Sequence, residues 1–195
     1  MNALIARLRQ GLVKCHRAFN LLKPSMVAYR GNSPANAKWA LVSYVKDAIN
    51  LKDGDPRLLG HSNFWECREI AQILSRLGYN VEAMSYDDPA TVPSRRYDLV
   101  LDIDAHLYRL AVNQDKTCVM ILLVTGSHHA WAAESELRRV ADFEKTHNAI
   151  YLPRMIQPSP YVLNRSLQLA DACLLIGNQT TQATFPPEFQ TKLRR

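Results

Sequence analysis

Histidines stand at two places where a predicted strand passes into a predicted helix. His61 precedes Ser62 and Asn63 in "GHSNFW", directly before an amphipathic stretch. His128 lies in "TGSHHAW", between a strongly apolar run and a second helical stretch. Imidazole titrates nearer neutral pH than any other side chain, so either ring could orient a hydroxyl group or take its proton. His61 and His128 are therefore the candidate catalytic residues.

Small polar residues surround both histidines and recur in a third segment, "GNQTT". Backbone N–H groups at a helix start can bind anions and hydroxyls, and Gly126 would let a ligand approach the backbone closely. The candidate substrate-binding residues are Ser62, Asn63, Thr125, Gly126, Ser127, Gly177, Asn178 and Thr181.

Each of these segments also has a purely structural interpretation. Asn63 followed by Glu66 has the spacing of a helix capping box, and Ser127 can cap the next helix. Gly177 and Asn178 can form an ordinary strand-to-helix turn, with the threonines after them acting as caps or as ligands. The sequence leaves both interpretations open.

The sequence does not predict a metal site. The adjacent His128 and His129 cannot easily face one ion, and only His61 offers a third ligand. The cysteines, Cys15, Cys67, Cys118 and Cys173, form no CxxC pair and are expected to be buried reduced thiols. Asp102 and Asp104 are interpreted as strand-edge residues, because the chain has no GxGxxG after the first strand and no GxxxxGK[ST].

Short apolar runs alternate with helical stretches after residue 37. The predicted strands are Trp39–Val45, Tyr79–Tyr86, Tyr97–Asp104, Thr117–Gly126, Asn148–Arg154 and Asp171–Asn178, and the predicted helices are Asn63–Leu77, Trp131–Lys145 and a helix around Pro160–Leu169. This alternation predicts an α/β domain with a Rossmann-like, doubly wound, mostly parallel sheet of about six strands. We assign residues 37–185 to this domain.

Ligands bind such sheets at the carboxyl ends of the strands. That rule selects the loops Lys46–Asn63, Asp87–Arg96, Thr125–His129 and Gly177–Thr181. We further expect the first and fourth predicted strands to be neighbours, which would place His61 and His128 in one crevice at the topological switch point.

The basic charge is concentrated at the N-terminus. Of the 24 Lys and Arg residues, eight lie in the first 46 positions with no acid among them, which leaves 16 against 18 Asp and Glu in the rest. Residues 2–20 place apolar side chains near one helical face, so residues 1–36 are expected to form a basic amphipathic arm. Such an arm suits an anionic membrane surface at least as well as packing on its own domain. Nucleic-acid binding is not expected of the slightly acidic body.

No apolar run reaches the ~18 residues of a membrane span, and the N-terminus has no signal-peptide pattern. We therefore expect a cytoplasmic protein that is peripheral to the membrane if the arm binds there.

Three segments together resemble the N-terminal half of family 4 glycosyltransferases, which have the GT-B fold. They are "GHSNFWECREIAQILSRLGYNVEAMSYDD", "LLVTGSHHAWAAESELRRV" and "LADACLLIGNQTTQATFP", within roughly Trp39 to Pro186. The resemblance implies an acceptor-side domain that contacts a sugar or another hydroxyl-bearing acceptor. The nucleotide-sugar donor and the E-x7-E element belong to a second, C-terminal domain, toward which residues 186–195 would lead.

The resemblance therefore implies a transferase half that is inactive alone, has no cofactor of its own and needs a donor domain, which could be a separate partner chain. Glu136 and Glu144 do have E-x7-E spacing, but they lie on a predicted first-domain helix near Arg138 and Arg139 and are interpreted as solvated acids. The alternative is a non-catalytic Rossmann-like binding or assembly module.

Overall fold

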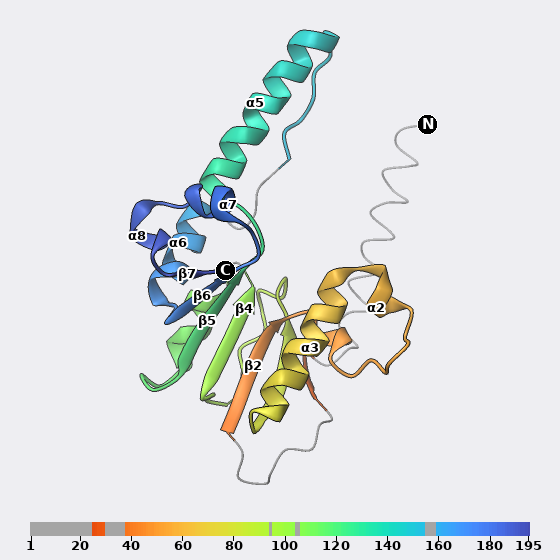
Figure 1. The fold of residues 1–195 in the computed structure, drawn as a ribbon, viewed down its shortest axis with the longest axis vertical. Coiled ribbons are helices and arrows are strands. Elements are labelled where there is room, and N and C mark those ends of the chain that lie inside the picture. The colour runs from red at the N-terminus through yellow and green to blue at the C-terminus, as the bar shows by residue number, and fades with distance from the viewer. Residues whose placement is uncertain (1–24, 30–37, 94, 104–105, 155–158) are drawn as a thin grey trace.

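The computed structural model describes residues 25–29, 38–93, 95–103, 106–154 and 159–195. Most of the predicted arm and Asp104 lie outside these residues. The described part contains one seven-stranded sheet with the order β1-β3-β2-β4-β5-β6-β7 (Figure 1). Its strands are β1 (Met26–Ala28), β2 (Lys38–Tyr44), β3 (Tyr79–Ser85), β4 (Leu99–Ile103), β5 (Val119–Val124), β6 (Ala172–Leu175) and β7 (Leu193–Arg194).

Helices connect these strands. The α-helices are α2 (Arg57–Gly60), α3 (Ser62–Arg76), α4 (Leu107–Leu110), α5 (His129–His147), α6 (Pro160–Leu169), α7 (Gln179–Ala183) and α8 (Pro187–Gln190), and the 3-10 helices are η1 (Lys46–Ala48) and η2 (Ala111–Asn113). In the described part of the chain, no helix combines the length and the apolar character needed to cross a membrane.

The predicted α/β class with a mostly parallel sheet is confirmed. All neighbouring strands pair in parallel except β1, which pairs antiparallel with β3 at the sheet edge. Met26–Ala28, which the sequence assigned to the arm, thus belongs to the sheet. At the other end, α8 and β7 extend the domain past residue 185, because Phe189 and Leu193 are buried in its core.

Helices lie on both faces of the sheet, as the doubly wound pattern predicts. Cys67, Ala71 and Leu74 of α3 pack on one face against β2 and β3. Leucines of α4 and α6 pack on the other face, and each fully buried leucine contributes about 1.5–3 kcal/mol. Every residue of β4 is buried, which fits its central place in the sheet.

The cysteines that the structure describes are free and buried, as predicted. Burial raises the pKa of the Cys67 thiol to about 12, so this side chain remains an uncharged thiol at neutral pH and packs as a small apolar group.

The predicted strand Asn148–Arg154 is wrong. Asn148 adopts a left-handed conformation at the end of α5 (φ 48°), and the chain then runs back along that helix without a strand partner. Side chains of α5 replace the missing ladder: Glu144 accepts from the Tyr151 amide (3.1 Å) and Glu136 from the Arg154 amide (2.7 Å). Glu136 and Glu144 therefore have a structural role, which agrees with discounting their E-x7-E spacing.

Candidate functional site

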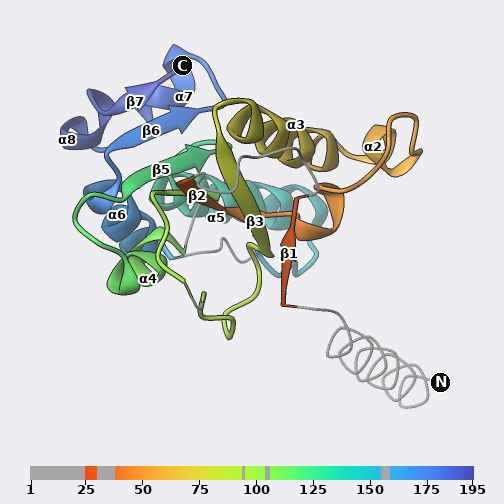
Figure 2. The ribbon, with the colours of Figure 1, turned by 90° about the horizontal axis from the view of Figure 1, so that it is seen from below.

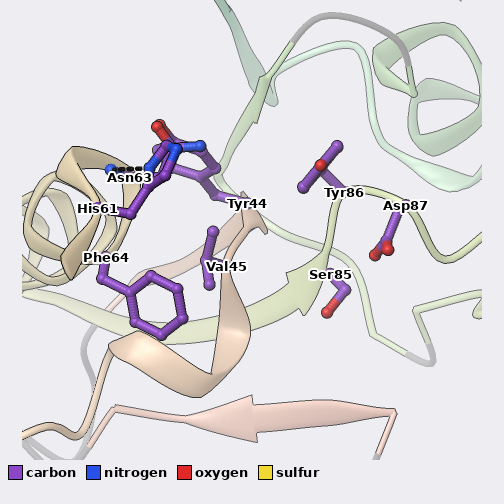
Figure 3. Close-up of a pocket in the computed structure, with 8 residues that line it drawn as sticks. All are labelled: Tyr44, Val45, His61, Asn63, Phe64, Ser85, Tyr86 and Asp87. Carbon is purple, nitrogen blue, oxygen red and sulfur yellow. Dashed lines mark hydrogen bonds between the residues drawn. The ribbon is translucent and has the colours of Figure 1, made fainter. Parts of the chain in front are cut away.

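A pocket of about 320 Å³ lies at the carboxyl ends of β2 and β3 (Figure 3). The lining residues are Tyr44, Val45, His61, Asn63, Phe64, Ser85, Tyr86 and Asp87. Tyr44 and Ser85 end their strands side by side in the parallel register, and the Tyr86 amide donates to the Tyr44 carbonyl (2.8 Å). Two segments distant in the sequence thus form opposite walls of one site at the edge where such sheets bind ligands.

The wall formed by α3 presents His61 and Asn63. Helix α3 begins at Ser62, and His61 is its N-cap, with Nδ1 accepting from the Asn63 amide (3.2 Å). Because Nδ1 is the acceptor, the neutral ring carries its proton on Nε2 and offers a hydrogen-bond donor. His61 in this arrangement can orient a hydroxyl oxygen and does not present a free basic nitrogen.

The expected capping box of Asn63 and Glu66 is wrong, because the helix starts one residue earlier than predicted. Glu66 accepts a hydrogen bond from the hydroxyl of the fully buried Tyr44 instead (2.7 Å). This bond fixes the floor of the pocket to α3. Asn63 is thereby left as a pocket residue, and its side chain lies beside His61 (Figure 3).

The opposite wall follows β3 and was not assigned from the sequence. Ser85, Tyr86 and Asp87 line the side of the pocket across from His61 and Asn63, with Val45 between the two walls (Figure 3). Asp87 adds a carboxylate and Tyr86 an aromatic ring. The loop rule did select Asp87–Arg96, so the position of the wall was predictable, although the side chains that face the pocket were not.

His106 is a further histidine near this edge that the sequence analysis did not single out. It precedes α4, and its ring hydrogen-bonds to the backbone of Tyr86. Burial, and then the positive charge of Arg109, lower the pKa of His106 below its usual value, so the ring is neutral at pH 7. His106 thus helps to fix the backbone of the second wall at Tyr86.

His128 lies in a different environment. It is only 3% exposed, its Nε2 lies 2.8 Å from Asn164 Oδ1, and its ring meets Phe185 edge-on. It is also the N-cap of α5, since its Nδ1 accepts from the Ala130 amide (3.3 Å), so the expected cap Ser127 does not fill that position. These contacts explain His128 as a core residue.

The predicted shared crevice of His61 and His128 is wrong in its geometry. The crevice required the strands before these residues to be neighbours, but β4 pairs with β2 on one side and with β5 on the other. The switch point therefore lies between β2 and β4. Of the two histidines, only His61 lines the pocket.

The other candidate binding residues gather around β5 and β6. Thr125, Gly126 and Ser127 form the turn between β5 and α5, and the next amide, that of His128, donates to the Thr184 hydroxyl (2.9 Å). The structure thus brings the second and third motifs together and leaves the first motif apart.

Gly177, Asn178 and Thr181 form a helix start. Asn178 and Thr181 make a capping box at the beginning of α7, in which the Thr181 amide donates to Asn178 Oδ1 (3.0 Å). A Cβ added at Gly177 would lie 2.8 Å from the Cβ of Thr181. Close packing against the first turn of the helix therefore explains this glycine.

Gly177→Ala should destabilise the protein by about 1–2 kcal/mol, because the new methyl group must displace Thr181 and open the capping box. Gly126→Ala is the matched control, since a Cβ added there meets no atom within 4 Å, and it should change the free energy of unfolding by less than about 0.5 kcal/mol. Urea unfolding measures both. Equal effects at the two glycines would contradict the packing argument.

No family model matches the chain, and no similar protein was found among curated proteins or solved structures. Among the described residues, no group of three or more His, Cys, Asp or Glu side chains is arranged to hold a metal ion. Function is therefore argued from the pocket.

Proposed function

We propose that this chain is the acceptor-side half of a sugar-nucleotide-dependent glycosyltransferase of the GT-B type, and that the pocket between α3 and the β3 loop binds a hydroxyl-bearing acceptor such as a sugar. The composition of the pocket carries this proposal. The aromatic rings of Phe64 and Tyr86 accompany groups that donate and accept hydrogen bonds, in a cavity open at the ligand-binding edge of the sheet.

The two walls have complementary roles in this proposal. His61 donates from Nε2 to an acceptor oxygen, and Asp87 on the facing wall accepts from a hydroxyl hydrogen. The imidazole N–H orients the hydroxyl, and the Asp87 carboxylate, which accepts its hydrogen, can take the proton as the oxygen attacks and so makes the hydroxyl more nucleophilic. His128 has no part in this arrangement.

The nucleotide-sugar is assigned to a donor domain outside this chain, as the family resemblance implies. We therefore expect the chain alone to bind simple glycosides weakly and to bind nucleotide-sugars not at all. Sugar transfer by the chain alone should be undetectable.

The test is ¹⁵N-labelled protein titrated with a panel of methyl glycosides and, separately, of nucleotide-sugars. At least one glycoside should shift the amide signals of residues 44–45, 61–64 and 85–87. Asp87→Asn should weaken its binding roughly tenfold, because one charged hydrogen bond is lost. Tyr161→Ala, at an exposed position on α6, is the control and should bind normally. Absence of glycoside binding, or turnover with a nucleotide-sugar, would contradict the proposal.

We also propose that residues 1–24 bind anionic membranes. They contain five basic residues and no acid, and each basic residue near such a surface contributes about 1 kcal/mol. Deleting residues 1–24, which leaves β1 in place, should reduce co-sedimentation with phosphatidylserine vesicles at least tenfold. High salt should have the same effect on the full chain. Equal sedimentation of the two proteins at low salt would disprove this role.

A further inference from the structure

Helix α5 and the segment that returns along it project from the body of the domain. The helix leaves the carboxyl end of β5 and continues beyond the strands, and residues 148–154 run back beside it (Figure 1). We call α5 and this returning segment, residues 129–154, the hairpin. In α5, His129 and Val140 are buried, whereas Trp131, Leu137 and Phe143 are exposed, so a large part of the hairpin surface is open to a partner.

The returning segment is fixed in a defined conformation. Tyr151 packs toward the helix, against Phe143 and below the guanidinium of Arg139, while Glu136 and Glu144 hold the backbone on either side of Leu152. The flanking side chains consequently point away from α5, and Ile150 and Leu152 are 93% and 83% exposed. Two large apolar side chains held outward by a polar framework indicate a contact surface.

One face of the sheet lacks the cover that such a sheet normally has. Val119 of β5 and Leu174 of β6 lie on the same face as α3, but α3 packs mainly on β2 and β3. Ile121 packs against the edge of the core under α3. No described helix lies over that face of β5 and β6 (Figures 1 and 2). We call Val119, Leu174 and Ile176, each at least 40% exposed, the bare strip.

We propose that two copies of this chain associate so that the hairpin of each covers the bare strip of the other. Strands buried on both faces need a helix layer on each, and this chain has one apolar strip without a helix and one hairpin without a sheet. The hairpin of one copy would provide the missing layer over the bare strip of the other. A two-fold axis forms both of these contacts in one dimer.

The dimensions agree with this arrangement. A helix of 19 residues is about 28 Å long, and six strand residues span about 20 Å, so the hairpin can cover the full length of β5. A two-fold dimer buries the exposed apolar side chains of two hairpins and two strips, among them Ile150, Leu152, Val119, Leu174 and Ile176 of each copy.

Charge favours a protein partner over an anionic membrane at this surface. The hairpin contains four basic residues (Arg138, Arg139, Lys145 and Arg154) and four acidic ones (Glu134, Glu136, Asp142 and Glu144). It therefore has no net charge to attract anionic lipid, and two hairpins can approach each other without net repulsion although the chain carries +6.

Light scattering coupled to size-exclusion chromatography tests the proposal. The full chain at roughly 100 μM should have a mass of about 44 kDa, twice the 22.2 kDa of one chain. Ile150→Asp with Leu152→Asp should give a monomer that still unfolds cooperatively, with a thermal midpoint that no longer rises with protein concentration, because these exposed side chains do not belong to the core of one chain. Leu174→Asp should also give a monomer. Val112→Asp, at a site that is 79% exposed on the opposite face, is the control and should stay dimeric.

A cross-link identifies the surfaces directly. In a Cys15→Ser background, a mixture of the Leu152→Cys and Leu174→Cys variants should form a disulfide-linked dimer that neither variant forms alone. A monomeric wild-type chain, a dimer that survives the aspartates, or a dimer lost only on deletion of residues 1–24 would each overturn the proposal. The last outcome would place the interface in the N-terminal segment.

Discussion

Replacing His128 with alanine should lower the thermal midpoint by about 5–12 °C, because the buried ring supports three neighbours at once. The substitution removes the contact with Asn164, the cap on the Ala130 amide and the edge of the ring against Phe185. It leaves a cavity and removes the partner of two part-buried polar groups, Asn164 Oδ1 and the Ala130 amide. Together these losses amount to about 2–4 kcal/mol.

His61→Ala is the matched comparison, since His61 is also a histidine N-cap but is exposed. His61→Ala should lower the free energy of unfolding by less than about 1 kcal/mol and the thermal midpoint by about 2 °C. Its main effect should be on ligand binding. Asn164→Ala completes a double-mutant cycle with His128→Ala. The double variant should lose clearly less stability than the sum of the losses in the two single variants. Similar thermal midpoints for the two histidine variants would refute the structural role of His128.

Asp102→Ala should destabilise the protein by about 3 kcal/mol, because this carboxylate of β4 accepts hydrogen bonds from the backbone amides at the start of α4. Asp102 was expected to be a strand-edge residue. It is instead fully buried near the end of the central strand β4, where Oδ2 accepts from the amides of His106 (2.6 Å) and Leu107 (2.8 Å). Without this oxygen, the buried amide of Leu107 and the part-buried amide of His106 lose their acceptor.

Asp98→Ala provides the control for Asp102→Ala. Asp98 also accepts from a backbone amide, that of Trp39 (2.8 Å), but at an exposed position where water can replace it. Its loss should cost about 1 kcal/mol or less. Asp102→Asn, which retains one acceptor oxygen, should lie between the two in urea unfolding. A loss at Asp102 no larger than that at Asp98 would mean that α4 does not depend on this cap.

The Asp102 variants also bear on the pocket. His106 follows the cap and hydrogen-bonds to the backbone of Tyr86, so a shift at the start of α4 reaches the wall that carries Asp87. Arg109, also on α4, donates to the carbonyls of Asp88 and Thr91 in the same loop. The geometry of the second wall thus depends on α4.

The sequence by itself determined most strands of the sheet and the longest helices. Alternation of apolar runs with helical stretches located β2 to β6, α3, α5 and α6, and polar turns located the starts of α3 and α5 to within two residues, but β1, β7 and the short helices were not predicted. These features depend on propensity, periodicity and caps within a few residues, which a sequence displays directly. The predicted strand Asn148–Arg154 has the same local pattern and is wrong. Its backbone amides bond to Glu144 and Glu136 of α5 instead of to a neighbouring strand.

Only the tertiary structure decided which of these elements lie together. Because β4 pairs with the free edge of β2, it separates His61 from His128, and burial then makes one a pocket residue and the other a core residue. The same assembly brings Asp87 opposite His61, buries Asp102 and leaves the hairpin outside the sheet. Strand order and burial arise from contacts between residues far apart in the chain, and no local pattern encodes them.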